Sequence, residues 1–279
     1  MDYAPGRFLG LPPEFSDSET AKYVIVPVPY EATVCFQTGT AEGPRAIIDV
    51  SPQVEWFDEE IRREYYQVGI ATDGAIPPAP SPAEEVARVK QRTAMWLEKG
   101  LFPILLGGEH SITSGAVEAV IEHHGPVSVL QFDAHADLRD AYTGGKYSHA
   151  SVMRRILEHT PDIVQVGIRS FSREESEQCP EQIARIITPR MVAADRDAVI
   201  DLILARLSEQ VYITIDIDCF DTSIAPGVGT PEPGGLLYDD VLAILRAVIR
   251  AKTVVGADVV EVLPLGGKQI TTEFLAARL

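Results

Sequence analysis

Two short segments of the sequence carry side chains of the kinds that bind metal ions. Asp133, His135 and Asp137 alternate along one segment, and Asp216 and Asp218 alternate along the other. In an extended chain, residues two apart point to the same face, so the members of each segment can converge. Carboxylates and imidazoles that converge in a buried place favour the binding of divalent metal ions.

A third segment adds His110, which follows the apolar run 102–106. The set then holds two imidazoles and four carboxylates, whose negative charges balance two divalent cations. Without a cation such a buried cluster would be intolerable, because unpaired carboxylates lose their hydration and take up protons instead. Oxygen-rich ligands with a minority of imidazole and no thiolate favour a hard ion, so Mn²⁺ fits better than Zn²⁺, and Mg²⁺ takes histidine poorly.

The elements that position these groups alternate between apolar strands and amphipathic helices. Strands are expected at 23–28, 102–106, 127–132, 163–168, 184–187, 211–215 and 253–260. Helices are expected at 82–99, 111–123, 148–159, 195–208, 238–251 and 271–279. Ser81 is a possible N-cap of the first of these helices, and Gly100 its stop. Continuous apolar strands imply an α/β fold whose parallel sheet has helices on each side, with ligands at the carboxyl ends of the strands.

Composition limits the possible classes of function. The length of 279 residues and the alternation of elements favour one domain over 1–279. A formal net charge of −17 argues against nucleic acid as a partner and mildly favours cationic ligands, although solubility alone also explains it. Three widely spaced cysteines, no secretory signal and no apolar stretch of the roughly 20 residues that a membrane helix needs favour a cytoplasmic protein without a membrane partner.

The same segments resemble the signature blocks of a known family. Segments 107–111 (Gly-Gly-Glu-His-Ser), 133–137 (Asp-Ala-His-Ala-Asp) and 216–221 (Asp-Ile-Asp-Cys-Phe-Asp) resemble, in this order, those of the arginase/agmatinase ureohydrolases. Further matching stretches lie at 39–47, 225–235 and 260–264, so the resemblance covers nearly the whole chain. It implies a single three-layer α/β/α domain with a mostly parallel central sheet, two Mn²⁺ per chain and a homo-oligomer, either a trimer or a hexamer.

The resemblance also implies how the ligands are shared between the two ions. Each ion has its own pair and two carboxylates bridge: His110 with Asp137, His135 with Asp218, and the bridging Asp133 and Asp216. Divalent ions lower the pKa of bound water to roughly 7, which supplies hydroxide to attack a guanidinium carbon. Asp137 would then pass the hydroxide proton to the leaving amine.

Three residues outside the ligand set receive roles from the resemblance. His149 matches a proton shuttle at the mouth of the site, and its alternative is a residue at a helix start. Glu261 ends the last strand and would grip the guanidinium by paired hydrogen bonds; the alternative is a salt bridge at the rim. Arg139 is a candidate substrate-binding residue, at a position where arginases usually carry asparagine.

Other polar residues near the blocks are interpreted as structural. Glu109 is expected to be a solvated turn residue, with a substrate contact as the alternative. Cys219 is expected to serve packing, and Asp221 is either an acceptor behind the ligands or a turn residue.

The sequence departs from the family pattern near Glu261. Leu263 stands where asparagine is usual, and segment 265–268 lacks an aspartate that commonly follows the proline at 264. Gln37 replaces a frequent arginine, and Thr222 a common proline. These changes bear on substrate identity, because the ligand set is intact.

The expected reaction is hydrolysis of agmatine, a small cationic guanidino substrate, to urea and putrescine. Segments 137–140 and 146–155 resemble the agmatinase branch, and Asp140 and Glu42 are available near the expected mouth for a distal ammonium. Arg139 could instead bind a distal carboxylate. The alternatives are N1-aminopropylagmatine, favoured by segment 27–33, then guanidinobutyrate or arginine, a non-catalytic metal-binding relative, and a single-zinc deacetylase.

Overall fold

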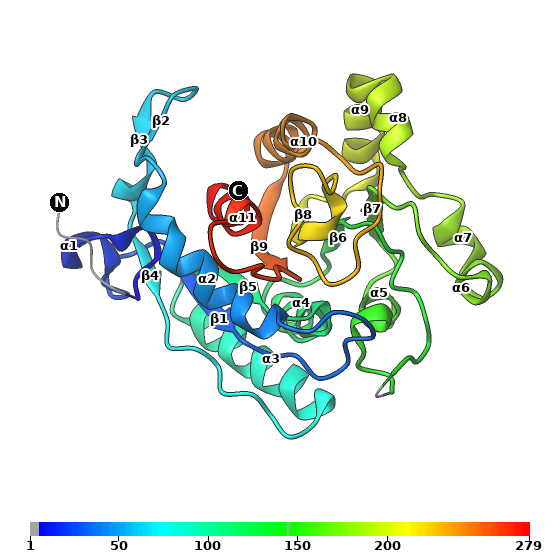
Figure 1. Ribbon diagram of the computed structural model, residues 1–279, viewed down its shortest axis with the longest axis horizontal. Helices are drawn as coiled ribbons and strands as arrows, with labels where there is room; N and C mark the ends of the chain where they lie inside the picture. Colours follow the sequence, from blue (N-terminus) through cyan, green and yellow to red (C-terminus); the bar gives the residue numbers. More distant parts are fainter. Residues whose placement is uncertain (1–5, 144) are drawn as a thin grey trace.

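A seven-stranded sheet forms the centre of the computed structural model, which describes residues 6–143 and 145–279. Every neighbouring pair of strands is parallel, in the order β4-β1-β5-β9-β8-β6-β7 (Figure 1). The strands are β1 (Tyr23–Val28), β4 (Ile70–Thr72), β5 (Phe102–Gly107), β6 (Ser128–Phe132), β7 (Ile163–Val166), β8 (Gln210–Asp216) and β9 (Thr253–Val260). Strands β2 (Phe57–Asp58) and β3 (Arg63–Glu64) form a separate antiparallel hairpin.

Helices occupy most of the connections between strands. They are α1 (Pro13–Ser16), α2 (Gly43–Val50), α3 (Pro82–Glu98), α4 (Thr113–His124), α5 (Val152–Ile156), α6 (Arg173–Gln178), α7 (Pro180–Ile183), α8 (Pro189–Ala194), α9 (Arg196–Arg206), α10 (Tyr238–Ala251) and α11 (Thr271–Arg278). Within the described part of the chain, none of them has both the length and the apolar character that crossing a membrane requires.

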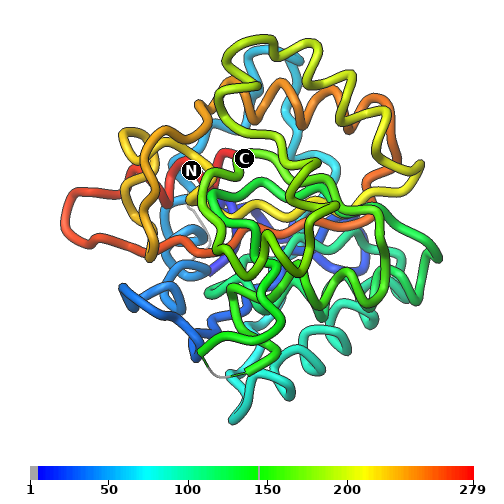
Figure 2. The backbone as a smooth tube through the Cα atoms, turned by 90° about the vertical axis from the view of Figure 1, so that its right-hand side faces the viewer, coloured from blue at the N-terminus to red at the C-terminus, as the bar shows by residue number. Residues whose placement is uncertain are grey.

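The sheet separates two hydrophobic clusters. Val24, Val26 and Val28 of β1 pack with residues of α3, α4 and α5, whereas Ile25 packs on the other face with residues of α2, α9, α10 and α11. This alternation is the period of two that a strand buried on both faces requires. Figure 2 shows the central strands between the cyan turns of α3 at the bottom and the orange turns of α10 at the top. The expected three-layer α/β/α architecture with a mostly parallel sheet is confirmed.

Local signals set several element ends where they were expected. The Ser81 hydroxyl accepts a hydrogen bond from the backbone N–H of Glu84 and caps α3. This helix ends at Glu98, and Gly100 follows with a φ of +78°, a conformation that glycine adopts without strain. Helix α10 and strand β9 have the bounds that the apolar pattern predicted.

Two expected elements differ in the structure. The strand expected at 184–187 is wrong: the segment is a turn after α7, and Ile187 pairs with the sheet through an isolated parallel bridge to Val166. Pro189, at the start of α8, leaves no length for a longer strand. The helix expected at 148–159 is divided between a short 3-10 helix, η6 (His149–Ser151), and α5.

The order of the strands places the chemically active residues along one edge. Strands β5, β9, β8 and β6 are consecutive neighbours and run in the same direction, so their carboxyl ends lie side by side. His110 comes after β5, Glu261 after β9 and Asp133 after β6, while Asp216 ends β8. The sheet therefore brings together residues that are far apart in the sequence.

Candidate metal centre

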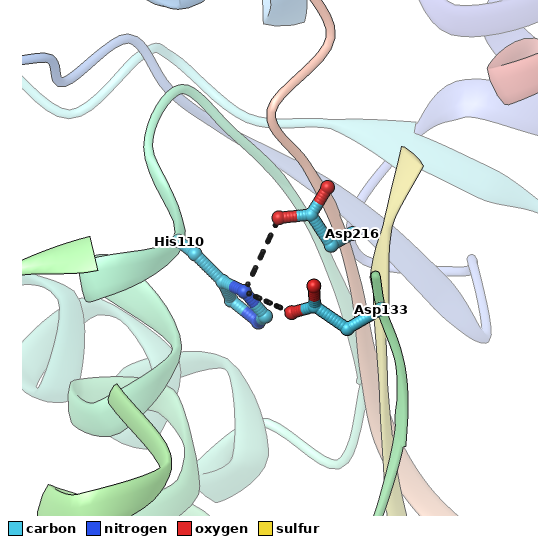
Figure 3. Close-up of side chains that lie close together, drawn as sticks. All are labelled: His110, Asp133 and Asp216. Carbon is cyan, nitrogen blue, oxygen red and sulfur yellow. Dashed lines mark ion pairs between the residues drawn. The ribbon is translucent and has the colours of Figure 1, made fainter. Parts of the chain in front are cut away.

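Two imidazoles and four carboxylates meet at this edge. We call His110, Asp133, His135, Asp137, Asp216 and Asp218 the strand-end cluster. His110 Nδ1 lies 3.1 Å from Asp133 Oδ2, 3.2 Å from Asp137 Oδ2 and 3.4 Å from Asp216 Oδ2. Figure 3 shows the imidazole facing the carboxylates of Asp133 and Asp216. These side chains are at most 8% exposed.

The second imidazole lies nearer to solvent. His135 Nδ1 is 2.9 Å from Asp218 Oδ2 and 3.7 Å from Asp133 Oδ1, and the His135 side chain is 27% exposed. The two oxygens of Asp133 thus face different imidazoles, so this carboxylate belongs to both halves of the cluster. Asp133 is also the residue shared by the two groups whose ligand atoms lie within 4.8 Å of one another, His110–Asp133–Asp216 and Asp133–His135–Asp218.

Backbone and side-chain donors fix the orientation of the carboxylates. Asp133 accepts hydrogen bonds from the backbone N–H of His135, at 2.6 Å, and from Nε2 of Gln131, at 2.7 Å. Asp218 accepts from the backbone N–H of Ala134, and Asp216 from the backbone N–H of Asp218, both at 2.9 Å. The short spacings of the motifs supply two of these donors, because the N–H two residues on reaches back to the carboxylate of Asp133 and of Asp216.

A chain of hydrogen bonds orients His110 from behind. Its Nε2 lies 2.9 Å from the hydroxyl of Thr214, which donates to Asp258 Oδ1 at 2.6 Å, and Tyr212 donates to the other oxygen of Asp258 at 2.8 Å. Because the Thr214 hydrogen points to Asp258, the Thr214 oxygen accepts from Nε2–H. In neutral His110 this leaves Nδ1 as a lone pair, and that atom is buried without a hydrogen-bond partner among the described residues.

This arrangement fits a bound cation. A lone pair on Nδ1 that faces three carboxylates is repelled unless a positive charge lies between them. Without a metal ion the cluster can balance its charge only by holding protons. Burial, followed by the charge of Asp133, raises the pKa of Asp137 to about 7. Burial and the Asp218 charge raise the pKa of Asp216 well above its usual range. His110, despite the opposing effect of burial, has its pKa raised by the surrounding carboxylates.

Two residues of this edge adopt left-handed backbone conformations. Asp137 has a φ of +54° and Glu261 a φ of +64°, in a region that costs side chains other than glycine about 1–3 kcal/mol. The carbonyl of Asp137 accepts from the N–H groups of Met153 and Arg154 at the start of α5, and the Glu261 N–H donates to the carbonyl of Gly108. Such strain persists where surrounding contacts hold it, and it directs both carboxylates into the site.

Glu261 faces the cavity from the end of β9. Its Oε1 accepts a hydrogen bond of 2.7 Å from the backbone N–H of His110, and its side chain lines the cavity. Burial raises its pKa well above the usual range of a glutamate. A cationic ligand would therefore be needed to keep this carboxylate ionised, which suits a guanidinium.

The cluster opens into a cavity of about 220 Å³. Its outer part, which we call the mouth, is lined by Cys35, Arg139, Tyr142 and Phe171. The guanidinium carbon of Arg139 lies 4.6 Å from the centre of the Tyr142 ring, so the two side chains stack.

His149 also lines the cavity, and burial, followed by the positive charge of His110 and His135, lowers its pKa to about 4. A larger cavity of about 1240 Å³ lies beside the β2–β3 hairpin and contains no member of the strand-end cluster.

The structure changes the interpretation of several residues near the site. Glu109 is not a solvated turn residue, because it is completely buried and accepts four hydrogen bonds. Asp140 lies outside the cavity lining and pairs with Arg155 at 2.8 Å, and Glu42 is also absent from the lining. Neither is positioned to bind a distal ammonium as the sequence suggested.

Two other interpretations are resolved by contacts. Asp221 accepts from Ser223 and from the N–H groups of Gly234 and Gly235, so it stabilises its own loop as a turn residue does. Cys219 is completely buried in the hydrophobic cluster, as expected for packing.

The sequence analysis missed the residues behind the cluster. Thr214 and Asp258 orient His110, and Thr33 contacts His149. Thr214 and Asp258 alternate with apolar residues inside strands, and a polar residue within an otherwise apolar strand was the available signal. For Thr33, which lies in a loop remote from His149 in sequence, there was none.

Known proteins share both this sequence and this architecture. A family model described as Arginase family matches residues 21–279. The chain belongs to the arginase family. It is 36% identical to an N(1)-aminopropylagmatine ureohydrolase of Synechocystis sp. over 99% of this chain and 94% of that protein. It is also 36% identical to an agmatinase of Pyrococcus horikoshii, over 88% of this chain and 85% of that protein.

A solved structure extends the comparison to the fold. Proclavaminate amidino hydrolase from Streptomyces clavuligerus superimposes with a TM-score of 0.88 at 30% sequence identity, covering 99% of this chain and 95% of that one. The chain is thus a hydrolase of the ureohydrolase family that acts on guanidino groups, with the family's α/β fold. The expected family, class of enzyme and fold are confirmed.

Proposed function

We propose that this chain is a binuclear manganese ureohydrolase that converts a guanidinium group to urea and an amine. The observation that carries the proposal is the carboxylate of Asp133, whose two oxygens face different imidazoles, next to an unpartnered His110 Nδ1. Mn²⁺ is the proposed metal because four carboxylates and two imidazoles form a hard, oxygen-rich ligand set without thiolate.

His110 with Asp137 would hold one ion and His135 with Asp218 the other. Asp133 belongs to both groups of ligand atoms and would be shared, and the family resemblance implies the same role for Asp216. When bound, a pair of divalent ions supplies Lewis acidity that makes water a nucleophile near neutral pH. The strand-end cluster contributes rigidity, since hydrogen bonds from the protein hold the carboxylates of Asp133 and Asp216.

The chain's own residues bind the substrate and move protons. Glu261 binds the guanidinium by charge-assisted hydrogen bonds and turns its carbon toward the cluster. Asp137 receives the proton released by the attacking water and passes it to the leaving amine nitrogen. His149, nearer to the mouth, exchanges protons between the site and solvent.

We propose N1-aminopropylagmatine as the substrate, with agmatine as the shorter alternative. Part of the argument for agmatine, the binding of its distal ammonium, relied on Asp140 and Glu42, which do not line the cavity. The carboxylates that line it outside the strand-end cluster are Glu261 and Glu175, and Glu175 already accepts hydrogen bonds from Leu138 and Ser172. A longer chain carrying ammonium groups instead suits the aromatic rings at the mouth, and the Synechocystis relative is named for that substrate.

One observation favours a second substrate class. Arg139 lines the mouth and forms no ion pair among residues 6–143 and 145–279, so its charge is available to a carboxylate on the far end of a substrate. A guanidino acid such as 4-guanidinobutyrate would use it. Arginine is the weakest candidate, because its amine and carboxylate would both need partners at the mouth.

The deciding experiment is urea release from a panel of guanidino compounds by protein loaded with Mn²⁺. The panel is N1-aminopropylagmatine, agmatine, 4-guanidinobutyrate and arginine, compared by kcat/KM under one condition. The expected order is the order of this list. Urea release from none of them would refute the proposed function, whereas the highest value for 4-guanidinobutyrate or arginine would refute only the interpretation of the mouth.

A further inference from the structure

Glu109 is a buried carboxylate that organises the loop after β1. Its Oε2 accepts from the backbone N–H groups of Ala32 and Thr33, both at 2.7 Å. Its Oε1 accepts from the hydroxyls of Thr33, at 2.8 Å, and Ser111, at 2.6 Å. Four donors converge on two oxygens, an arrangement completed by the ionised carboxylate. Glu109 therefore holds Thr33 in a defined position although 76 positions separate them in sequence.

The Thr33 hydroxyl links this carboxylate to His149. Its oxygen lies 3.1 Å from Nδ1 of His149 and accepts a 3.0 Å hydrogen bond from the backbone N–H of the same residue. A hydroxyl has one hydrogen, and the charged Glu109 is the stronger acceptor for it. The Thr33 oxygen is then an acceptor toward His149. Nδ1 has two hydroxyl neighbours, Thr33 at 3.1 Å and Ser148 at 3.4 Å, and the shorter contact is satisfied by a hydrogen on Nδ1.

We propose that Glu109 and Thr33 are positioning residues that hold neutral His149 as the tautomer protonated at Nδ1, so that the Nε2 lone pair is free for proton transfer. The inference rests on the proposed function only for its purpose, because the tautomer is inferred from the hydrogen bonds of Thr33 with Glu109 and His149. Tyr142 meets the ring edge-on at a centroid distance of 5.9 Å and limits its rotation.

The proton balance of the shuttle follows from this arrangement. Asp137 supplies the proton with which the amine leaves. Nε2 takes one proton from solvent and gives it to the released amine, which becomes an ammonium, while the hydrogen on Nδ1 stays bonded to Thr33. The imidazolium that forms in between keeps its Nδ1 hydrogen on Thr33 and carries the transferred proton on Nε2. Without the Thr33 acceptor, the hydrogen of the neutral ring can sit on Nε2, and that form cannot accept a proton at Nε2.

Two substitutions of Thr33 distinguish the effect of its hydroxyl from the effect of its side-chain shape. Thr33→Val keeps the branched shape and the backbone N–H to Glu109, and we expect it to lower kcat by roughly 10- to 100-fold, part of the 10²- to 10⁴-fold that positioned proton transfer supplies. KM should change by less than about threefold, and two metal ions should remain bound. Thr33→Ser restores the hydroxyl and should recover most of kcat.

A matched control is available on a neighbouring loop, between β6 and η6. The Thr143 hydroxyl donates to the carbonyl of Thr33 at 2.7 Å, so Thr143→Val also removes a hydroxyl next to this residue. It does not touch the link to His149, and kcat should stay within about threefold of the parent. An equal loss of kcat in Thr143→Val and Thr33→Val, or loss of metal in Thr33→Val, would show that Thr33 acts through the loop and overturn the proposal.

A double-mutant cycle tests whether Thr33 acts through His149. We expect His149→Asn to lower kcat with both metals bound, and Thr33→Val to cause no further loss in that background. If the two effects multiply, Thr33 does not act through the imidazole, and the assignment is wrong.

The tautomer can be read without any turnover. The chain has six histidines, so a ¹⁵N-histidine NMR spectrum of protein loaded with diamagnetic Zn²⁺ is simple, and the signals absent in His149→Asn identify this ring. We expect a protonated Nδ1 and an unprotonated Nε2 in the parent, and a mixture of both tautomers in Thr33→Val. A parent protonated at Nε2 would overturn the proposal even if the protein releases urea, and the expected result would support it even if no substrate is turned over.

Discussion

The strand-end cluster and the mouth are built in opposite ways. The cluster sits at the ends of buried parallel strands, its carboxylates are held by backbone N–H groups, and most of its side chains are almost completely buried. The mouth is formed by loops, and its aromatic ring at Phe171 is 47% exposed. A rigid cluster at strand ends suits a reaction that is common to a family. Exposed loop residues at the mouth can change and select another substrate without disturbing the cluster.

The largest expected effect comes from the carboxylate shared by both halves of the cluster. Asp133→Ala should abolish binding of both metal ions, because each oxygen of Asp133 faces a different imidazole. Activity should fall by well over roughly 100-fold, which is the upper end of the loss expected when a residue that hydrogen-bonds to a metal ligand is removed. Elemental analysis, circular dichroism and urea release test this, with His135→Ala as the comparison expected to lose one ion. Two ions bound to folded Asp133→Ala would contradict the assignment.

A smaller effect is expected one step behind the cluster. Thr214→Val removes the acceptor for His110 Nε2–H and the donor to Asp258, so the imidazole loses its orientation. Affinity for Mn²⁺ should fall by about 10- to 100-fold, measured by competition with a metal-binding dye. Thr214→Ser keeps the hydroxyl and should bind as the parent does. Equal affinities for all three proteins would show that Thr214 does not support the imidazole.

Metal binding by the cluster should depend on pH. The pKa of Asp137 is raised to about 7 by burial and by Asp133, so this carboxyl holds a proton below pH 7 in the metal-free chain. A metal ion must displace that proton, and apparent affinity should therefore fall as pH drops, by about tenfold per unit for each proton displaced. Calorimetry at pH 6, 7 and 8 measures the slope, and Asp137→Asn should reduce it. Equal affinity at pH 6 and 8 is the contrary result.

The smallest effect is expected at the mouth, and it should alter selectivity more than turnover. Arg139→Ala removes a positive charge, so kcat/KM for N1-aminopropylagmatine should rise by about two- to fivefold, as screened interactions of below about 1 kcal/mol allow. The value for 4-guanidinobutyrate should fall, because its carboxylate loses a partner. The ratio of the two kcat/KM values reports both changes. A loss of metal, or an equal change for both substrates, would show that Arg139 belongs with the cluster and does not select the substrate.

The expectations of a homo-oligomer and a cytoplasmic location stay predictions. So does a single domain over 1–279, although the seven-stranded sheet contains strands from Tyr23 to Val260.

Sequence patterns were sufficient for the fold and for the members of the cluster. Continuous apolar strands alternating with helices led to the parallel sheet, and the spacing of Asp133, His135 and Asp137 led to their convergence. Both are local properties: a strand or helix follows from a run of neighbours, and Asp133 and Asp216 each accept a hydrogen bond from the backbone N–H two residues on. The same reasoning failed at 184–187, where an apolar run between α7 and Pro189 has no length to pair as a strand.

Tertiary structure decided everything that depends on partners distant in sequence. Glu109 looks like a polar turn residue, and only the approach of the loop at Thr33 makes it a buried acceptor of four hydrogen bonds. Asp140 looks available to a substrate until Arg155 pairs with it. The chain specifies the chemistry of its strand ends through short spacings, whereas burial and pairing of the residues around them depend on contacts that no local pattern encodes.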